Sequence, residues 1–133
     1  MNIFIDVDYT LIAANGSPRP HARELFIRLK EFGHSIYVWS GMGKRESEME
    51  AHGLAPFVDG YSVKSLEDYV DAVAKMKLGA SPDLVVDDHA DIVEAFGGYA
   101  VKPYFFPEDR DRDLSRAASA ILDFAETGSC SAT

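Results

Sequence analysis

Three short apolar runs of the sequence are each followed by side chains that bind metal ions or phosphate groups. In chain order, the residues that follow these runs are Asp6, Asp8 and Thr10, then Ser40 and Gly41, and finally Asp87, Asp88 and Asp91. In an open parallel sheet, ligands bind beyond the carboxyl ends of the strands. If the three apolar runs are strands of one such sheet, these polar groups meet at a single edge.

Carboxylates gathered at one edge of a sheet repel each other, and a bound cation relieves that repulsion. The sequence places no cluster of Cys or His beside them, so oxygen atoms supply the ligands. Such ligands favour Mg²⁺ over zinc, because magnesium prefers carboxylate, carbonyl and water oxygens. His89 follows Asp88 directly, a position from which it could approach the metal site, but we interpret it as a histidine at a helix start or on the surface. The sequence therefore predicts a magnesium site.

The elements that must position these groups can be traced from the hydrophobic pattern. Strands are predicted at residues 2–7, 34–39, 60–63, 84–86 and 99–106. Helices are predicted at residues 20–33, 44–52, 65–78, 88–96 and 114–125, with loops or turns at residues 9–20 and 40–43. The alternation of strands and helices predicts an α/β fold with three layers, Rossmann-like, around a mainly parallel sheet. We expect one domain at residues 1–126 and a polar, disordered tail at residues 127–133.

Composition narrows the classes of partner. A length of 133 residues and an apolar content of 47% suit one domain with a single core. The formal net charge of −9 disfavours nucleic acid as a partner. The lone cysteine, Cys130, has no intramolecular disulfide partner, and we see neither a signal peptide nor a membrane-spanning stretch. We therefore expect a cytoplasmic protein that does not associate with membranes.

The order of these motifs resembles that of the haloacid dehalogenase superfamily. The segment from Asp6 to Leu11 is similar to the first motif of that family, and Ser40 to its phosphate-binding Ser/Thr. Lys64 resembles its basic residue, and Asp87 and Asp88, with Asp91, resemble its acidic motif. The resemblance covers residues 2 to about 105 and implies a cap-less, phosphatase-type member of the family.

The resemblance implies a phosphohydrolase that works through an aspartyl-phosphate intermediate. Asp6 is then nucleophile and metal ligand, and Asp8 is general acid and base with its main-chain carbonyl as a further ligand. Asp87 completes the metal shell, with Asp88 or Asp91 as the remaining carboxylate. The phosphate-binding residues are then Thr10, Ser40, Gly41 and Lys64. The basic residue stays open between Lys64 and Lys44.

Tyr9 is a departure from the family pattern, which often has glycine there. No insertion long enough to form a cap follows the first strand or precedes the third helix, so we expect an open site. Such a site accepts a phosphorylated macromolecule or small molecule, and association into a homo-oligomer is one way to build a lid.

Two other functions are compatible with the sequence. The first is a signalling receiver domain, whose clustered Asp residues accept a phosphoryl group. A receiver carries its acidic pair after the first strand, whereas here the pair comes late. The second is a catalytically silent member of the family that binds metal, phosphate or a protein.

Overall fold

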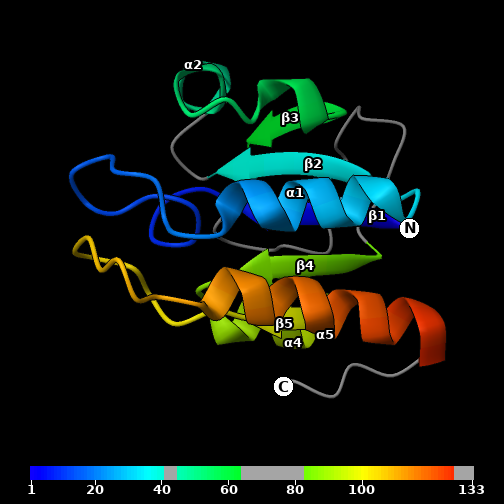
Figure 1. The fold of residues 1–133 in the computed structure, drawn as a ribbon. Helices are drawn as coiled ribbons and strands as arrows, with labels where there is room; N and C mark the ends of the chain where they lie inside the picture. The colour runs from blue at the N-terminus through cyan, green and yellow to red at the C-terminus, as the bar shows by residue number, and fades with distance from the viewer. Residues whose placement is uncertain (41–44, 64–82, 128–133) are drawn as a thin grey trace.

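Five parallel strands form the central sheet of the protein (Figure 1). The structure is a computed structural model that describes residues 1–40, 45–63 and 83–127. The strands are β1 (Asn2–Asp6), β2 (Ser35–Ser40), β3 (Gly60–Val63), β4 (Leu84–Asp87) and β5 (Gly98–Ala100). Their order across the sheet is β3-β2-β1-β4-β5, and every neighbouring pair is parallel. The sequence prediction of a parallel α/β sheet is therefore confirmed.

Helices cover both faces of this sheet (Figure 1). The described helices are α1 (Ala22–Glu31), α2 (Glu46–Ala51), the short 3-10 helix η1 (Ala55–Phe57), α4 (Ala90–Phe96) and α5 (Asp113–Thr127). Helices α1 and α5 pack side by side on one face, and α4 packs against β4 and β5 on the other. The fold is Rossmann-like with three layers. Within the described residues, no helix combines the length and apolar character needed to cross a membrane.

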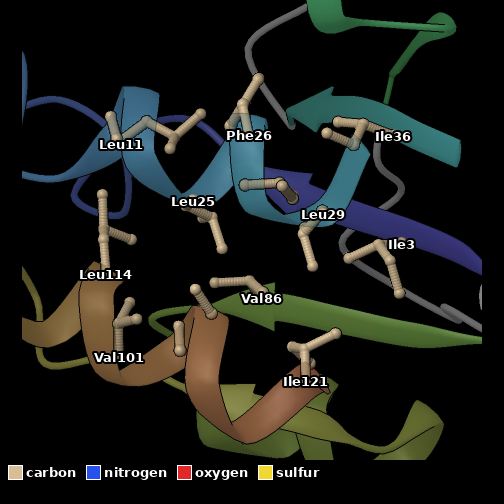
Figure 2. Close-up of a cluster of buried hydrophobic side chains, with 14 of the residues drawn as sticks. Ile3, Leu11, Leu25, Phe26, Leu29, Ile36, Val86, Val101, Leu114 and Ile121 are labelled. Carbon is tan, nitrogen blue, oxygen red and sulfur yellow. The ribbon is translucent and has the colours of Figure 1, made fainter. Parts of the chain in front are cut away.

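The central strand β1 explains why the apolar run at the N-terminus is nearly continuous. Ile3 and Ile5 are fully buried in the core cluster that also contains residues of α1 and α5. Figure 2 shows Ile3 among these side chains. Phe4 points to the opposite face and packs with Trp39 and Val85 in a second cluster that includes residues of α4. A strand of a parallel sheet is buried on both faces and therefore needs apolar residues without polar alternation.

The strand order places a topological switch point between β1 and β4. From β1 the chain moves outward to β2 and β3, and then returns to the other side of β1 for β4 and β5. Crevices at such points are where open α/β sheets bind ligands. Figure 1 shows the loop after β1 and the segment after β5 extending beyond the carboxyl ends of the strands. Asp6 ends β1 and Asp87 ends β4, so both predicted carboxylates lie at this point.

The last strand is shorter than the sequence predicts. We expected it at residues 99–106, but β5 ends at Ala100. The chain then leaves the sheet: the Tyr104 amide donates to the Tyr9 carbonyl at 2.8 Å, and the Ala14 amide donates to the Phe105 carbonyl at 2.9 Å. The segment therefore runs along the loop that follows β1.

Gly98 is the first residue of β5. A Cβ atom on Gly98 would lie 1.9 Å from the Val85 carbonyl oxygen, so the close approach of β5 to β4 requires glycine there. The helix expected at residues 65–78, the turn after Ser40 and the tail beyond residue 127 lie outside the described residues.

Candidate metal centre

Four side chains from two neighbouring strand ends converge at the switch point. Asp6, Asp87, Asp88 and His89 each offer one ligand atom, and these atoms all lie within 4.8 Å of one another. Asp6 is 3% exposed and Asp87 is fully buried. Carboxylates this close and this buried are typical of a cation site, because a shared positive ion offsets their repulsion.

Thr10 connects the carboxylates of the two strands. Its Oγ1 lies 3.1 Å from Asp6 Oδ2 and 3.2 Å from Asp88 Oδ1. The single hydroxyl hydrogen serves one carboxylate at a time. Thr10 is fully buried, so this contact fixes the relative positions of Asp6 and Asp88. The predicted phosphate-binding residue Thr10 therefore contacts carboxylates in this structure.

His89 lies at the start of α4 and also contacts the carboxylate group. Both its backbone N and its Nδ1 lie 3.0 Å from Asp87 Oδ1, and Nδ1 lies 3.3 Å from Asp88 Oδ1. It directly precedes α4 and its side chain is 55% exposed, as expected of a histidine at a helix start on the surface. The contact with two carboxylates corresponds to the alternative that the sequence disfavoured, which the position of His89 directly after the acidic pair had indicated.

Asp8 faces a different partner. Its Oδ2 lies 2.6 Å from Arg45 Nη1, which is also 3.4 Å from Ser40 Oγ. Arg45 Nε lies 3.2 Å from Glu48 Oε1. Burial by itself lowers the pKa of Arg45, but Asp8 and Glu48 raise it above its ordinary value, so the guanidinium stays charged. Sequence reasoning did not identify Arg45, although a basic residue five positions after a predicted phosphate-binding serine was a usable signal.

The backbone after β1 explains why Asp8 does not point the same way as Asp6. The strand ends at Asp6, and the amides of residues 10–12 all donate to the Val7 carbonyl at 2.9 to 3.2 Å. This reversal places Tyr9 in the left-handed region at φ 62°, where a residue other than glycine is uncommon. Continued strand geometry, which would align Asp8 with Asp6, therefore does not hold.

A buried arginine holds the loop that carries these residues. The Arg19 side chain is fully buried, and its Nε and Nη2 contact the two carboxylate oxygens of Asp111 at 2.8 and 3.0 Å. Its Nη1 donates to the Thr10 carbonyl at 3.3 Å, and its guanidinium lies 5.0 Å from the Tyr104 ring centroid. Burial by itself raises the pKa of Asp111, but the hydrogen bonds and charge of Arg19 hold it below its ordinary value.

The acidic residues 108–113, which lead into α5, are only partly solvated. Helix α5 begins at Asp113, which is buried and lies 3.6 Å from Arg19 Nη2. Asp113 also accepts a 2.7 Å hydrogen bond from the Tyr99 hydroxyl. Burial and this hydrogen bond raise the pKa of Tyr99 to about 12. The acidic run contributes buried partners as well as surface charge.

Two of the remaining predicted site residues lie near the carboxylate group, and the others lie outside the described residues. Ser40 is buried at the end of β2 beside Arg45, and Asp91 is exposed on α4 outside the carboxylate group. Gly41, Lys44 and Lys64 lie outside the described residues. A hollow lined by Phe32, His34, Leu122 and Ala125 lies near the start of β2. It is at the amino ends of the strands, whereas the carboxylates are at their carboxyl ends.

The chain matches no model of a known protein family and no curated protein sequence. Functional assignment therefore depends on the chemistry of the site. Its buried carboxylates offer hard oxygen ligands for a divalent cation, and one of them, Asp6, ends the central strand where a substrate can approach.

Proposed function

We propose that the protein is a magnesium-dependent phosphate-ester hydrolase that uses Asp6 as a covalent nucleophile. The observation that carries this proposal is the convergence of Asp6, Asp87 and Asp88 at the switch point between β1 and β4. Carboxylates that are buried close together repel each other, and a bound divalent cation offsets that cost. A catalytic cation site gives a reason for this arrangement.

The donor set fits magnesium. Asp6, Asp87 and Asp88 provide carboxylate oxygens, and the ligand atoms they offer lie close enough to share one ion. His89 contacts Asp87 and Asp88, and we assign it the role of orienting these ligands. When bound, Mg²⁺ polarises the phosphoryl oxygens and offsets their negative charge.

The reaction uses two aspartates, Asp6 at the end of β1 and Asp8 in the loop that follows it. Asp6 attacks phosphorus, so an Asp6–phosphorus bond forms while the phosphorus–oxygen bond to the ester breaks. Asp8 donates a proton to the departing ester oxygen. It then takes a proton from water as that water attacks the aspartyl phosphate, which releases phosphate and restores Asp6. Arg45 contacts both Asp8 and Ser40. The Ser40 hydroxyl is suited to donate a hydrogen bond to the phosphoryl group.

The first test is the Asp6→Asn substitution, which removes the nucleophilic oxygen and keeps the shape of the side chain. We expect hydrolysis of aryl phosphates and of a panel of phosphorylated metabolites and peptides, in the presence of Mg²⁺, to fall by on the order of a thousandfold or more. Circular dichroism should show an unchanged fold. The matched control is Asp109→Asn, which changes an exposed carboxylate in the same way.

Trapping the aspartyl-phosphate intermediate distinguishes hydrolysis from the other functions that the sequence allows. Acid quenching and mass spectrometry should find a transient phosphoryl group on the peptide that contains Asp6. A phosphoryl group that persists without repeated release of phosphate would indicate a receiver domain. Wild-type turnover by Asp6→Asn would exclude Asp6 as the nucleophile.

A further inference from the structure

Arg45 occupies a central position between two groups that the proposed reaction uses. It directly precedes α2, and its side chain is 13% exposed. One nitrogen, Nη1, contacts both the Asp8 carboxylate at 2.6 Å and the Ser40 hydroxyl at 3.4 Å. The guanidinium therefore links the end of β2 to the loop that follows β1.

The guanidinium has donors left for another acceptor. Nη1 serves Asp8 and Ser40, and Nε serves Glu48. Arginine carries five N–H donors in a planar fork, and two of them belong to Nη2. Within the described part of the chain, Nη2 makes no hydrogen bond or ion pair. An oxygen that approaches beside Ser40 and Asp8 can therefore pair with Nη2 without breaking the contact to Asp8.

Charge indicates what kind of acceptor this is. The site gathers the carboxylates of Asp6, Asp87 and Asp88, Arg45 itself is paired with Asp8, and the whole chain carries a formal net charge of −9. A phosphoryl group that enters this environment needs fixed positive charge near its oxygens. Arginine suits that role because its fork matches two phosphate oxygens and its charge does not depend on pH.

We propose that Arg45 binds a phosphoryl oxygen of the substrate and at the same time positions Asp8 to exchange protons with the ester oxygen; this inference rests on the proposed hydrolase function. The ligand class is the dianion of a phosphate monoester, or inorganic phosphate as its product. Ser40 and Arg45 hold the phosphoryl group from the β2 side, while the carboxylate group lies on the β1 and β4 side. Loss of Arg45 therefore weakens phosphate binding and also slows the proton transfers.

The experiment compares Arg45→Ala and Arg45→Lys with the control Arg23→Ala, which removes an exposed arginine on α1. The probe is inorganic phosphate, titrated calorimetrically into each protein in the presence of Mg²⁺. We expect Arg45→Ala to bind phosphate at least about tenfold more weakly, since a charge-assisted contact contributes roughly 1.5 to 3 kcal/mol. Arg45→Lys should recover part of the affinity, and the control should match the wild type.

Kinetics provide the second readout. Arg45→Ala should raise KM and also lower kcat, and added guanidinium should restore part of its kcat without affecting the wild type. A wild-type protein that binds no phosphate, or an Arg45→Ala variant with wild-type affinity and kinetics, would overturn the assignment. If phosphate binding depends on Arg45 but no phosphate ester is hydrolysed, the hydrolase proposal fails and Arg45 remains an anion-binding residue.

Discussion

Asp88 and Asp91 lie three residues apart at the start of α4, and they have different surroundings. Asp88 Oδ1 contacts Thr10 Oγ1 and His89 Nδ1 inside the carboxylate group. Asp91 is exposed and contributes no atom to that group. Asp88 precedes the helix and its extended N-cap His89, so the rule that helical residues three apart share a face does not apply to this pair.

This difference predicts which carboxylate supports the cation. In Asp88→Asn, the Mg²⁺ concentration that gives half-maximal hydrolysis should rise by about 10- to 100-fold, since groups that ligate or orient a metal contribute that much to its affinity. Asp91→Asn is the matched control on the same helix and should leave the Mg²⁺ dependence unchanged. A larger shift in Asp91→Asn than in Asp88→Asn would reassign the ligand. The measurement is a Mg²⁺ titration of the initial rate.

At the scale of single residues, the sequence predicts the carboxylates better than their partners. Asp6 and Asp87 follow apolar runs, and parallel strands end at one edge, so their proximity follows from the fold class. The contact of Arg45 with Asp8 depends on the backbone reversal after Val7 and on the direction of a long side chain. Neither has a signature in the local pattern, and this is why Arg45 was missed.

At the scale of elements, Arg19 joins two segments that no strand pairing holds together. It binds the Thr10 carbonyl in the loop after β1 and the Asp111 carboxylate just before α5. The Tyr104 amide adds a hydrogen bond between the same two segments. The loop that carries Asp8 and Thr10 is thus held by the C-terminal part of the chain.

Arg19→Met should destabilise the fold by about 3 to 5 kcal/mol, because it leaves the Asp111 and Asp113 carboxylates without their buried cation. Arg28→Met is the control, since Arg28 and Glu24 form a pair that is more than one third exposed on each side and such pairs contribute about 1 kcal/mol or less. Urea unfolding followed by circular dichroism measures both. Equal losses in the two variants would show that the Arg19 contacts do not stabilise the fold.

Most elements could be predicted from periodicity, and the segment after β5 shows where that signal ends. Residues 99–106 have the composition of a strand, and their backbone hydrogen bonds indeed join another segment. The partner is the loop after β1 and not the sheet. Composition favours extended backbone but does not specify which segment completes its hydrogen bonds.

At the scale of the whole molecule, one buried histidine makes stability depend on pH. His34 is 8% exposed just before β2, and its Nδ1 lies 3.1 Å from the N-terminal ammonium of Met1. Burial, and then the charge of that ammonium group, lower the pKa of His34 below its ordinary value of 6.5. The unfolded chain therefore binds this proton more readily than the folded protein does.

The contribution of His34 to the free energy of unfolding should not change with pH above 6.5, the ordinary pKa that applies to the unfolded chain. It should decrease as the pH falls through and below 6.5. His34→Gln should remove this dependence. Glu24, Asp59 and Asp111 have lowered pKa values, and their contribution is lost only at more acidic pH, below their ordinary values of 4.5, 3.8 and 3.8. Urea unfolding at pH 5.5 to 8 would measure the effect, and an identical slope in His34→Gln would exclude His34 as its source.

The strand order also determines when the sheet can form during synthesis. Strand β1 is made first, and it pairs with β2 on one side, but its other neighbour, β4, ends only at Asp87. Until that stretch has left the ribosome, the nascent chain exposes one backbone edge of β1. Unpaired strand edges recruit other chains and promote aggregation. The nascent chain is therefore expected to be most prone to aggregation before β4 has been synthesised.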